Sequence, residues 1–179
     1  MKHSLLKLWV CILILWTCSA CQQSVHSNSN LPTINIAKKN QLFQRYDLLH
    51  FAEKNEPVLL TLDEFFDGNN DEASIAPNFT EKPPIGEYYK SLKALADDPR
   101  NKAAFAEIKD INIYPDGHLR EDEWFYTDVI YFIGDLTPEE IVAATAHLMP
   151  DEVDYCTDSR LKNLQDRFQG SKIVYVWWD

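Results

Sequence analysis

The N-terminal residues constrain this chain most, because they separate an export leader from the part that folds. A basic segment over residues 1–7 is followed by an apolar run from Leu8 to Thr17 and then by Cys18-Ser19-Ala20-Cys21. A basic start, a short hydrophobic core and small residues before a cleavage point are typical of a secretory signal peptide. We therefore predict a signal peptide over residues 1–20 and expect the remainder of the chain to fold after export.

Cys21 determines how the exported protein is held. Its place directly after Ser19-Ala20 resembles a bacterial lipoprotein leader, in which this cysteine becomes the acylated first residue of the mature protein. Several acyl chains, at roughly 0.8 kcal/mol per buried methylene, form a stable anchor. We predict lipidation of Cys21 and a cell-membrane protein that faces the periplasm. Gln22 rather than Asp follows the cysteine, which favours the outer membrane in a cell with two membranes.

A second interpretation of the leader stays open. Lipoprotein leaders usually carry Leu three residues before the acylated cysteine, and here Cys18 stands at that position. Cys18-Ser19-Ala20 also suits ordinary signal peptidase, which would release a secreted soluble protein. A transmembrane anchor fits neither interpretation. The apolar core, counted from Leu8 to Ala20, has about 13 residues, whereas a helix that spans a membrane needs roughly 20.

The residues after the leader divide into two parts. A run rich in Gln, Ser and Asn is too polar to fold by itself, so we expect residues 21–36 to form the lipidated cysteine and a flexible tether. Residues 37–179 suffice for a single globular domain with one sizeable core. Only Cys156 lies in that domain, so no internal disulfide is expected, and we interpret its thiol as a buried structural group.

The charge of the chain restricts its partners. The formal net charge is -11, and removal of the two leader lysines makes the mature protein more acidic still. Nucleic acid is therefore an unsuitable partner, since binding to phosphates depends on Lys and Arg. A basic protein partner, divalent cations and simple solubility are all compatible with this charge.

The spacing of apolar residues predicts an α+β domain. Capping-box sequences beginning at Thr61 and Thr137 open two helices. The expected architecture is a mostly antiparallel sheet of about four strands with helices packed on it. Helices are expected over 38–53, 62–66, 84–95 and 137–148, with a helical or irregular stretch over 158–168, and strands over 57–60, 104–114, 124–133 and 172–178.

Two details of the sheet follow from the sequence. The turn residues Pro115-Asp116-Gly117-His118 predict that the second and third strands form an antiparallel hairpin. The last strand is almost continuously apolar, which places it inside the sheet. Successive residues of a strand face opposite ways, so one of Trp177 and Trp178 faces the core. The other is either an aromatic anchor for a partner or is covered by helices on the second face.

Two acidic loops are the candidate binding elements. The loop from Asp67 to Asp71 offers oxygen ligands at alternate positions, as a calcium loop does, but Glu72 and Asn78 stand where Gly and a bidentate Glu belong. The alternative is a surface turn in which Asp and Asn bond their own backbone. A second charged loop precedes Trp124, and its alternative is a solvated hairpin tip. The predicted partner-binding residues are Asp67, Asp71, Glu72, Glu121, Asp122, Glu123 and Trp178.

No sequence pattern supports catalysis. The histidines His50, His118 and His147 fall on different expected elements, and no His-x-x-x-His or Cys-x-x-Cys spacing predicts a zinc site. The nucleophile-elbow, phosphate-loop and dinucleotide patterns are absent from the sequence as well. We expect no catalytic residue, no metal and no cofactor. The sequence leaves open only a triad assembled from distant residues.

Three segments of the chain carry a resemblance. They are Leu62-Asp63-Glu64-Phe65-Phe66 with Gly68-Asn69, Asp71 and Ser74-Ile75, then Pro150-Asp151-Glu152-Val153, and last Val176-Trp177-Trp178-Asp179. In this order the chain resembles a group of small, acidic, uncharacterised bacterial proteins. The resemblance implies no activity, cofactor or catalytic residue. Members of the group usually lack an export leader, and this chain departs from them there.

Two functions follow from these observations. The favoured one is a non-enzymatic envelope lipoprotein whose acidic domain binds a basic protein partner, such as an immunity-type inhibitor that captures a toxin in the same compartment. The alternative is an envelope protein that binds a cation or a small ligand through the Asp67–Asp71 loop.

Overall fold

The computed structural model of the chain describes residues 34–114 and 118–179. The predicted signal peptide, Cys21 and most of the predicted tether lie outside the described residues, as do residues 115–117 of the predicted turn. Within the described ranges, no helix combines the length and the apolar character needed to cross a membrane.

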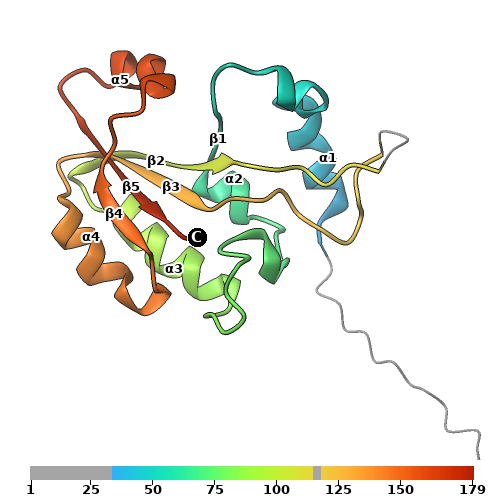
Figure 1. Cartoon of the computed structure of the whole chain (residues 1–179), viewed down its shortest axis with the longest axis horizontal. Helices are drawn as coiled ribbons and strands as arrows, with labels where there is room; N and C mark the ends of the chain where they lie inside the picture. The colour runs from blue at the N-terminus through green and yellow to red at the C-terminus, as the bar shows by residue number, and fades with distance from the viewer. Residues whose placement is uncertain (1–33, 115–117) are drawn as a thin grey trace, which may run out of the picture. The chain divides into compact units, whose positions relative to one another are not determined.

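One antiparallel sheet organises the described residues (Figure 1). Its strands lie in the order β1-β2-β3-β5-β4, and every neighbouring pair is antiparallel. The strands are β1 (Val58–Thr61), β2 (Asn101–Ile108), β3 (Val129–Gly134), β4 (Glu152–Tyr155) and β5 (Lys172–Trp177). The predicted α+β class with an antiparallel sheet is confirmed, and the sheet has one strand more than expected.

Helices lie on both sides of this sheet. In Figure 1, α3 and α4 lie below the strands and α5 lies above them. We call the side of α2, α3 and α4 face one, and the side of α5 face two. The α-helices are α1 (Ile36–Arg45), α2 (Leu62–Phe66), α3 (Ile85–Ala96), α4 (Pro138–Thr145) and α5 (Lys162–Arg167). Short 3-10 turns occupy Leu48–Glu53, Glu72–Ser74, Ala146–Leu148 and Ser159–Leu161.

The central strands bury both of their sides. On β3, Ile130 and Phe132 join the main core on face one, whereas Tyr131 and Ile133 join a smaller cluster on face two. A strand that is buried on both sides has a continuously apolar sequence, as β3 has. The last strand, β5, lies between β3 and β4 as predicted.

Helix starts follow the local sequence closely. Thr61 and Thr137 both form the predicted capping boxes, with Glu64 and Glu140 as reciprocal partners. The helix predicted over 38–53 is broken, because Asp47 adopts a left-handed conformation with φ 48° and a 3-10 turn follows.

The fold begins before the predicted boundary at residue 37. Ile34 is 5 % exposed in the main core, and the Asn35 side chain accepts a hydrogen bond from the Lys38 N–H to cap α1. Residues 34–36, which the sequence assigned to the tether, therefore pack on the domain.

The predicted β2–β3 hairpin is confirmed, but its regular ladder is shorter than the two predicted strands. Beyond Ile108 and before Val129, isolated bridges join Asp110 to Tyr126 and Ile113 to Leu119. Trp124 and Phe125 are consecutive and both buried, at 2 % and 0 % exposed. Both belong to the main core on face one, and successive residues of a regular strand face opposite sides of the sheet, so the chain leaves the ladder here.

Candidate functional site

The two acidic loops singled out in the sequence meet in the structure. The Asp71 carboxylate of the first loop accepts a hydrogen bond from the backbone N–H of Trp124 at 2.8 Å. The backbone N–H of Thr127 donates to the carbonyl of Ser74, also at 2.8 Å. Since backbone groups of the second loop make both contacts, they fix where one loop lies against the other.

A pocket of about 450 Å³ opens where these loops meet, and we call it the acidic pocket. Its carboxylates are Asp71, Asp110 and Glu123, and its aromatic walls are Trp124 and Tyr126. The remaining lining residues are Ala73, Ser74, Pro77, Asn78 and Asn112. The carboxylates come from three separate positions in the chain, and the fold brings them to one place.

The potential in the acidic pocket is negative. The pKa of Tyr126 is raised to about 12, first by burial and then by the nearby charges of Asp128, Asp179 and Asp110, which oppose a phenolate. In the described part of the chain, Asp71 and Asp110 form no ion pair with a basic side chain within 4.0 Å. Arg120 pairs with Glu123, and Lys39 and Lys82 lie near Asp71, so Asp110 is the least compensated carboxylate of the pocket. Its charge favours a cationic occupant.

Two buried polar atoms at the acidic pocket have no partner among the described residues. Trp124 is 2 % exposed, and its indole Nε1 has no acceptor. Oε2 of Glu123 is also buried without a donor, while the same carboxylate forms an ion pair with Arg120 at 2.8 Å. Buried polar groups of proteins are normally hydrogen-bonded, so these two atoms are exceptions.

Two lysines hold the loops from inside. Lys39 is 2 % exposed, and its ammonium donates to the carbonyls of Arg120 and Glu123. Lys82 donates to the carbonyls of Ile75 and Ala76 at 2.6 and 3.0 Å. Burial lowers the pKa of each lysine, and nearby carboxylates oppose that shift.

The structural role of Lys39 was not predicted from the sequence. The signal for it is its position on α1, three residues before Leu42 and therefore on the apolar side of the helix. A lysine there is either buried with partners or extended to the surface, and the sequence does not distinguish the two.

Two residues of the first loop lie outside the pocket lining. Asp67 is exposed and pairs with Lys38 at 3.0 Å. Glu72 accepts a hydrogen bond from the backbone N–H of Ile85 at 2.8 Å and so caps the start of α3. The structure therefore brings Asp71, but not Asp67 or Glu72, to the acidic pocket.

The second loop divides in the same way. Glu123 lines the acidic pocket, whereas Glu121 lines a smaller hollow of about 240 Å³ beside α1. Asp122 is exposed and lies 3.6 Å from the guanidinium of Arg120. Only Glu123 of the three predicted acidic residues therefore belongs to the same pocket as Asp71.

Trp178 requires a correction. It was assigned to partner binding, but the structure buries it completely on face one, where its indole N–H donates to the carbonyl of Leu148 at 2.9 Å. The alternation of the strand turns its neighbour Trp177 to face two, where it is half-buried. The half-buried aromatic side chains of β5 on face two are therefore Tyr175 and Trp177.

The first acidic loop has the geometry of a self-bonded turn. Both oxygens of Asp71 are used, one by the N–H of Ala73 at 2.9 Å and the other by the N–H of Trp124. The Asn69 oxygen accepts from the N–H of Asp71 at 3.0 Å. In the ranges that the structure describes, no group of three or more His, Cys, Asp or Glu side chains is placed to hold a metal ion.

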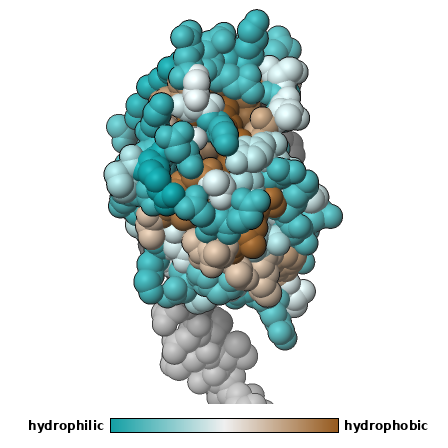
Figure 2. All heavy atoms as spheres, turned by 90° about the vertical axis from the view of Figure 1, so that its left-hand side faces the viewer, coloured by the Kyte–Doolittle hydropathy of each residue, from teal (hydrophilic) through white to brown (hydrophobic). Residues whose placement is uncertain are grey.

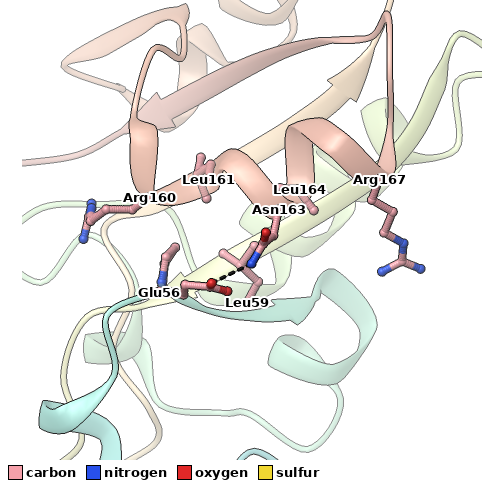
Figure 3. Close-up of a pocket in the computed structure, with 8 residues that line it drawn as sticks. Glu56, Leu59, Arg160, Leu161, Asn163, Leu164 and Arg167 are labelled. Carbon is pink, nitrogen blue, oxygen red and sulfur yellow. Dashed lines mark hydrogen bonds between the residues drawn. The ribbon is translucent and has the colours of Figure 1, made fainter.

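Face two of the sheet is covered over only part of its area. Figure 3 shows α5 lying over the sheet, with Asn163 donating to Glu56 at 2.5 Å and with Arg160 and Arg167 extending from opposite ends of the segment. A groove of about 190 Å³ separates α5 from the start of β1. Figure 2, which views the side with α4 and α5, shows apolar atoms in patches between mostly polar ones.

These features define a small α+β domain, built on one antiparallel sheet, with an acidic pocket between two loops. A model described as the uncharacterised protein YfbO family matches residues 37–173. The chain therefore belongs to this family of uncharacterised proteins, in agreement with the resemblance seen in its motifs. No curated protein and no solved structure matches the chain.

Proposed function

We propose that this domain binds a basic partner protein by accepting a Lys or Arg side chain in the acidic pocket. One observation carries the proposal. Asp71, Asp110 and Glu123 converge on a single pocket that has Trp124 and Tyr126 as its walls. Carboxylates with aromatic faces are a suitable environment for an organic cation.

The chemistry of the pocket favours a peptide over a bare ion. A volume of about 450 Å³ is suited to an organic group and is far larger than a metal ion needs. A guanidinium can bond two carboxylate oxygens at once and stack on an aromatic ring.

The leader and the net charge supply the setting for this function. Lipidation at Cys21 would hold the domain at the cell membrane, and the charge of -11 would speed the capture of a basic protein. An immunity-type inhibitor that captures a basic toxin in the envelope is the role that combines these properties. The alternative role for the Asp67–Asp71 loop is cation binding. It has less support, because Asp67 lies outside the acidic pocket and pairs with Lys38, so the loop alone offers a metal ion few ligands.

The direct test is binding of two blocked, dye-labelled peptides to the purified protein. One carries a single Arg between Gly residues, and the other carries citrulline, which has the same shape without the charge. We expect the Arg peptide to bind and to weaken steeply as salt rises, because its charge is the recognised feature. Fluorescence anisotropy at low and high salt measures both effects.

Matched variants locate the site. Asp110→Asn should weaken the Arg peptide about tenfold, since it removes a charge from the pocket without touching a backbone contact of the loops. Asp67→Asn removes an equally exposed charge outside the pocket and should leave binding within about twofold. Equal binding of the two peptides, or equal losses in the two variants, would contradict the proposal.

A further inference from the structure

The open part of face two holds a second pocket, on the opposite side of the sheet from the main core. It has a volume of about 500 Å³ and lies between β3, β5 and the segment that follows β4. We call it the face-two pocket. Its lining residues are Lys109, Val129, Tyr131, Asp154, Tyr155, Cys156, Thr157, Asp158, Tyr175 and Trp177.

The floor of the face-two pocket is aromatic. Tyr131 on β3 stands opposite Tyr175 on β5, and Val129 stands opposite Trp177 in the next position. Tyr131 is 4 % exposed, whereas Tyr175 and Trp177 are half-buried. Side chains at paired positions of neighbouring strands lie side by side, so these rings form a continuous surface that α5 leaves partly uncovered.

A buried carboxylate lies beside this floor, on the neighbouring strand β2. Glu107 is 3 % exposed, and the hydroxyl of Tyr131 donates to it at 2.6 Å. The ammonium of Lys109 lies 3.1 Å from the same carboxylate, and the guanidinium of Arg160 lies 3.7 Å away. The charge of Lys109 is therefore compensated inside the protein, which leaves it a poor receptor for an anion.

The remaining charges of the face-two pocket are negative. Asp158 forms an ion pair with Arg160 at 2.6 Å, and Asp128 lies 3.8 Å from Lys109. Asp154 lies opposite Tyr175 on β4 and has no ion pair with a described basic side chain within 4.0 Å. Lys172 is a further cation, with its ammonium 5.0 Å from the centre of the Tyr155 ring. Four carboxylates, with Glu107 included, thus stand against the three cations Lys109, Arg160 and Lys172, and the excess charge is negative.

We propose that the face-two pocket binds a small organic cation, an amine with an aromatic or apolar body. The rings of Tyr175 and Trp177 would contact the apolar body of the ligand, and the faces of these rings would attract its ammonium group. Asp154 would supply the counter-charge at the rim. Volume, aromatic lining and a few polar groups together are the usual composition of a small-ligand site.

This inference is independent of the proposed binding of a basic protein, because the two pockets share no lining residue. The probes are phenethylamine, the neutral phenethyl alcohol and the anionic hydrocinnamate, which share a phenyl ring and differ in charge. Calorimetry and tryptophan fluorescence of the full-length protein measure binding. We expect phenethylamine to bind at least about tenfold more tightly than the alcohol, and hydrocinnamate to bind most weakly.

Variants assign the binding to the face-two pocket. Asp154→Asn should weaken phenethylamine about tenfold, and its exposed position on β4 keeps the melting temperature unchanged. Trp177→Leu should abolish the fluorescence change, whereas Asp110→Asn in the acidic pocket should alter neither readout. No binding of phenethylamine at millimolar concentration, equal binding of the alcohol, or an equal loss in Asp110→Asn would overturn the inference.

Discussion

Lys39 shows how one buried side chain holds a functional surface together. Its ammonium reaches two carbonyls of the second acidic loop from α1, far away in sequence. The charge is desolvated there, which lowers its pKa, but the carbonyls and nearby carboxylates offset that cost. The loop that supplies Glu123 to the acidic pocket is thus fixed by a group that never touches the pocket.

Lys39→Met tests this role. The methionine keeps most of the volume but leaves the carbonyls of Arg120 and Glu123 without their donor, so we expect a loss of about 2 kcal/mol in the free energy of unfolding. Urea denaturation measures it. The neighbouring Lys38→Met, which removes only the exposed pair with Asp67, should cost no more than about 0.5 kcal/mol. Similar costs for both variants would show that Lys39 has no special role.

Asp128 gives a prediction with a definite sign for pH. Burial raises the pKa of Asp128 above the ordinary value of 3.8. The charge of Lys109 lowers this pKa in part, and the charge of Glu107 raises it further. The folded protein therefore holds this proton more tightly than the unfolded chain does. The resulting stabilisation is complete below the ordinary value and is lost as pH rises through the raised pKa.

Asp128→Asn should remove that loss, because an amide stays neutral at every pH. Relative to the unmodified protein, we expect the variant to gain stability as pH rises above the ordinary value of 3.8 and through the raised pKa. The ion pair with Lys109 that it gives up is long and contributes little. Unfolding midpoints of both proteins across this range measure the difference. A constant difference with pH would mean that Asp128 titrates normally.

The helices illustrate which elements a sequence determines locally. Thr137 and Glu140 exchange hydrogen bonds at the start of α4, with the Glu140 carboxylate accepting the Thr137 N–H at 3.0 Å. All of this information lies within four consecutive residues, so the capping box is readable before any tertiary contact exists. The same holds for Thr61 and α2.

Thr137→Ala should cost about 1 kcal/mol, because it removes the oxygen that accepts the Glu140 N–H at the start of the helix. Thermal and urea unfolding of the variant measure the loss. Thr80→Ala, at an exposed position outside every helix and strand, is the matched control and should change stability by less than about 0.5 kcal/mol. A loss that Thr80→Ala reproduces would rule out the cap as its cause.

Elements that depend on distant contacts were harder to predict. The strand β4 has two acidic residues among its four and no apolar run, so only its pairing with β5 identifies it. Asp71 and Glu123 were each named from the sequence, but their convergence depends on the contact between Asp71 and Trp124. The prediction that Trp178 binds a partner was wrong. The alternation of side chains along a strand shows that Trp177 and Trp178 face opposite ways, but it does not show which of the two faces the core.

For the whole protein, the leader and the domain make separate contributions. The domain supplies the acidic pocket, and Cys21 is the residue that would fix the protein to a membrane. The main core is built from residues between Ile34 and Trp178, so we expect the domain to fold without that attachment.

Cys21→Ser therefore separates location from folding. We expect the variant to leave the membrane fraction, because serine at that position is not acylated, and to keep the melting temperature of the domain. Fractionation with immunodetection measures the first effect and thermal unfolding the second. Persistence of the variant in the membrane fraction would show that the anchor is not an acyl chain on Cys21.

The position of β4 at the margin of the sheet has a consequence for assembly. An outer strand exposes unpaired backbone groups and invites a second molecule to continue the sheet. Glu152 and Asp154, both exposed on β4, would stand near the same residues of a second copy. We expect their mutual repulsion to oppose self-association of the protein through this margin of the sheet.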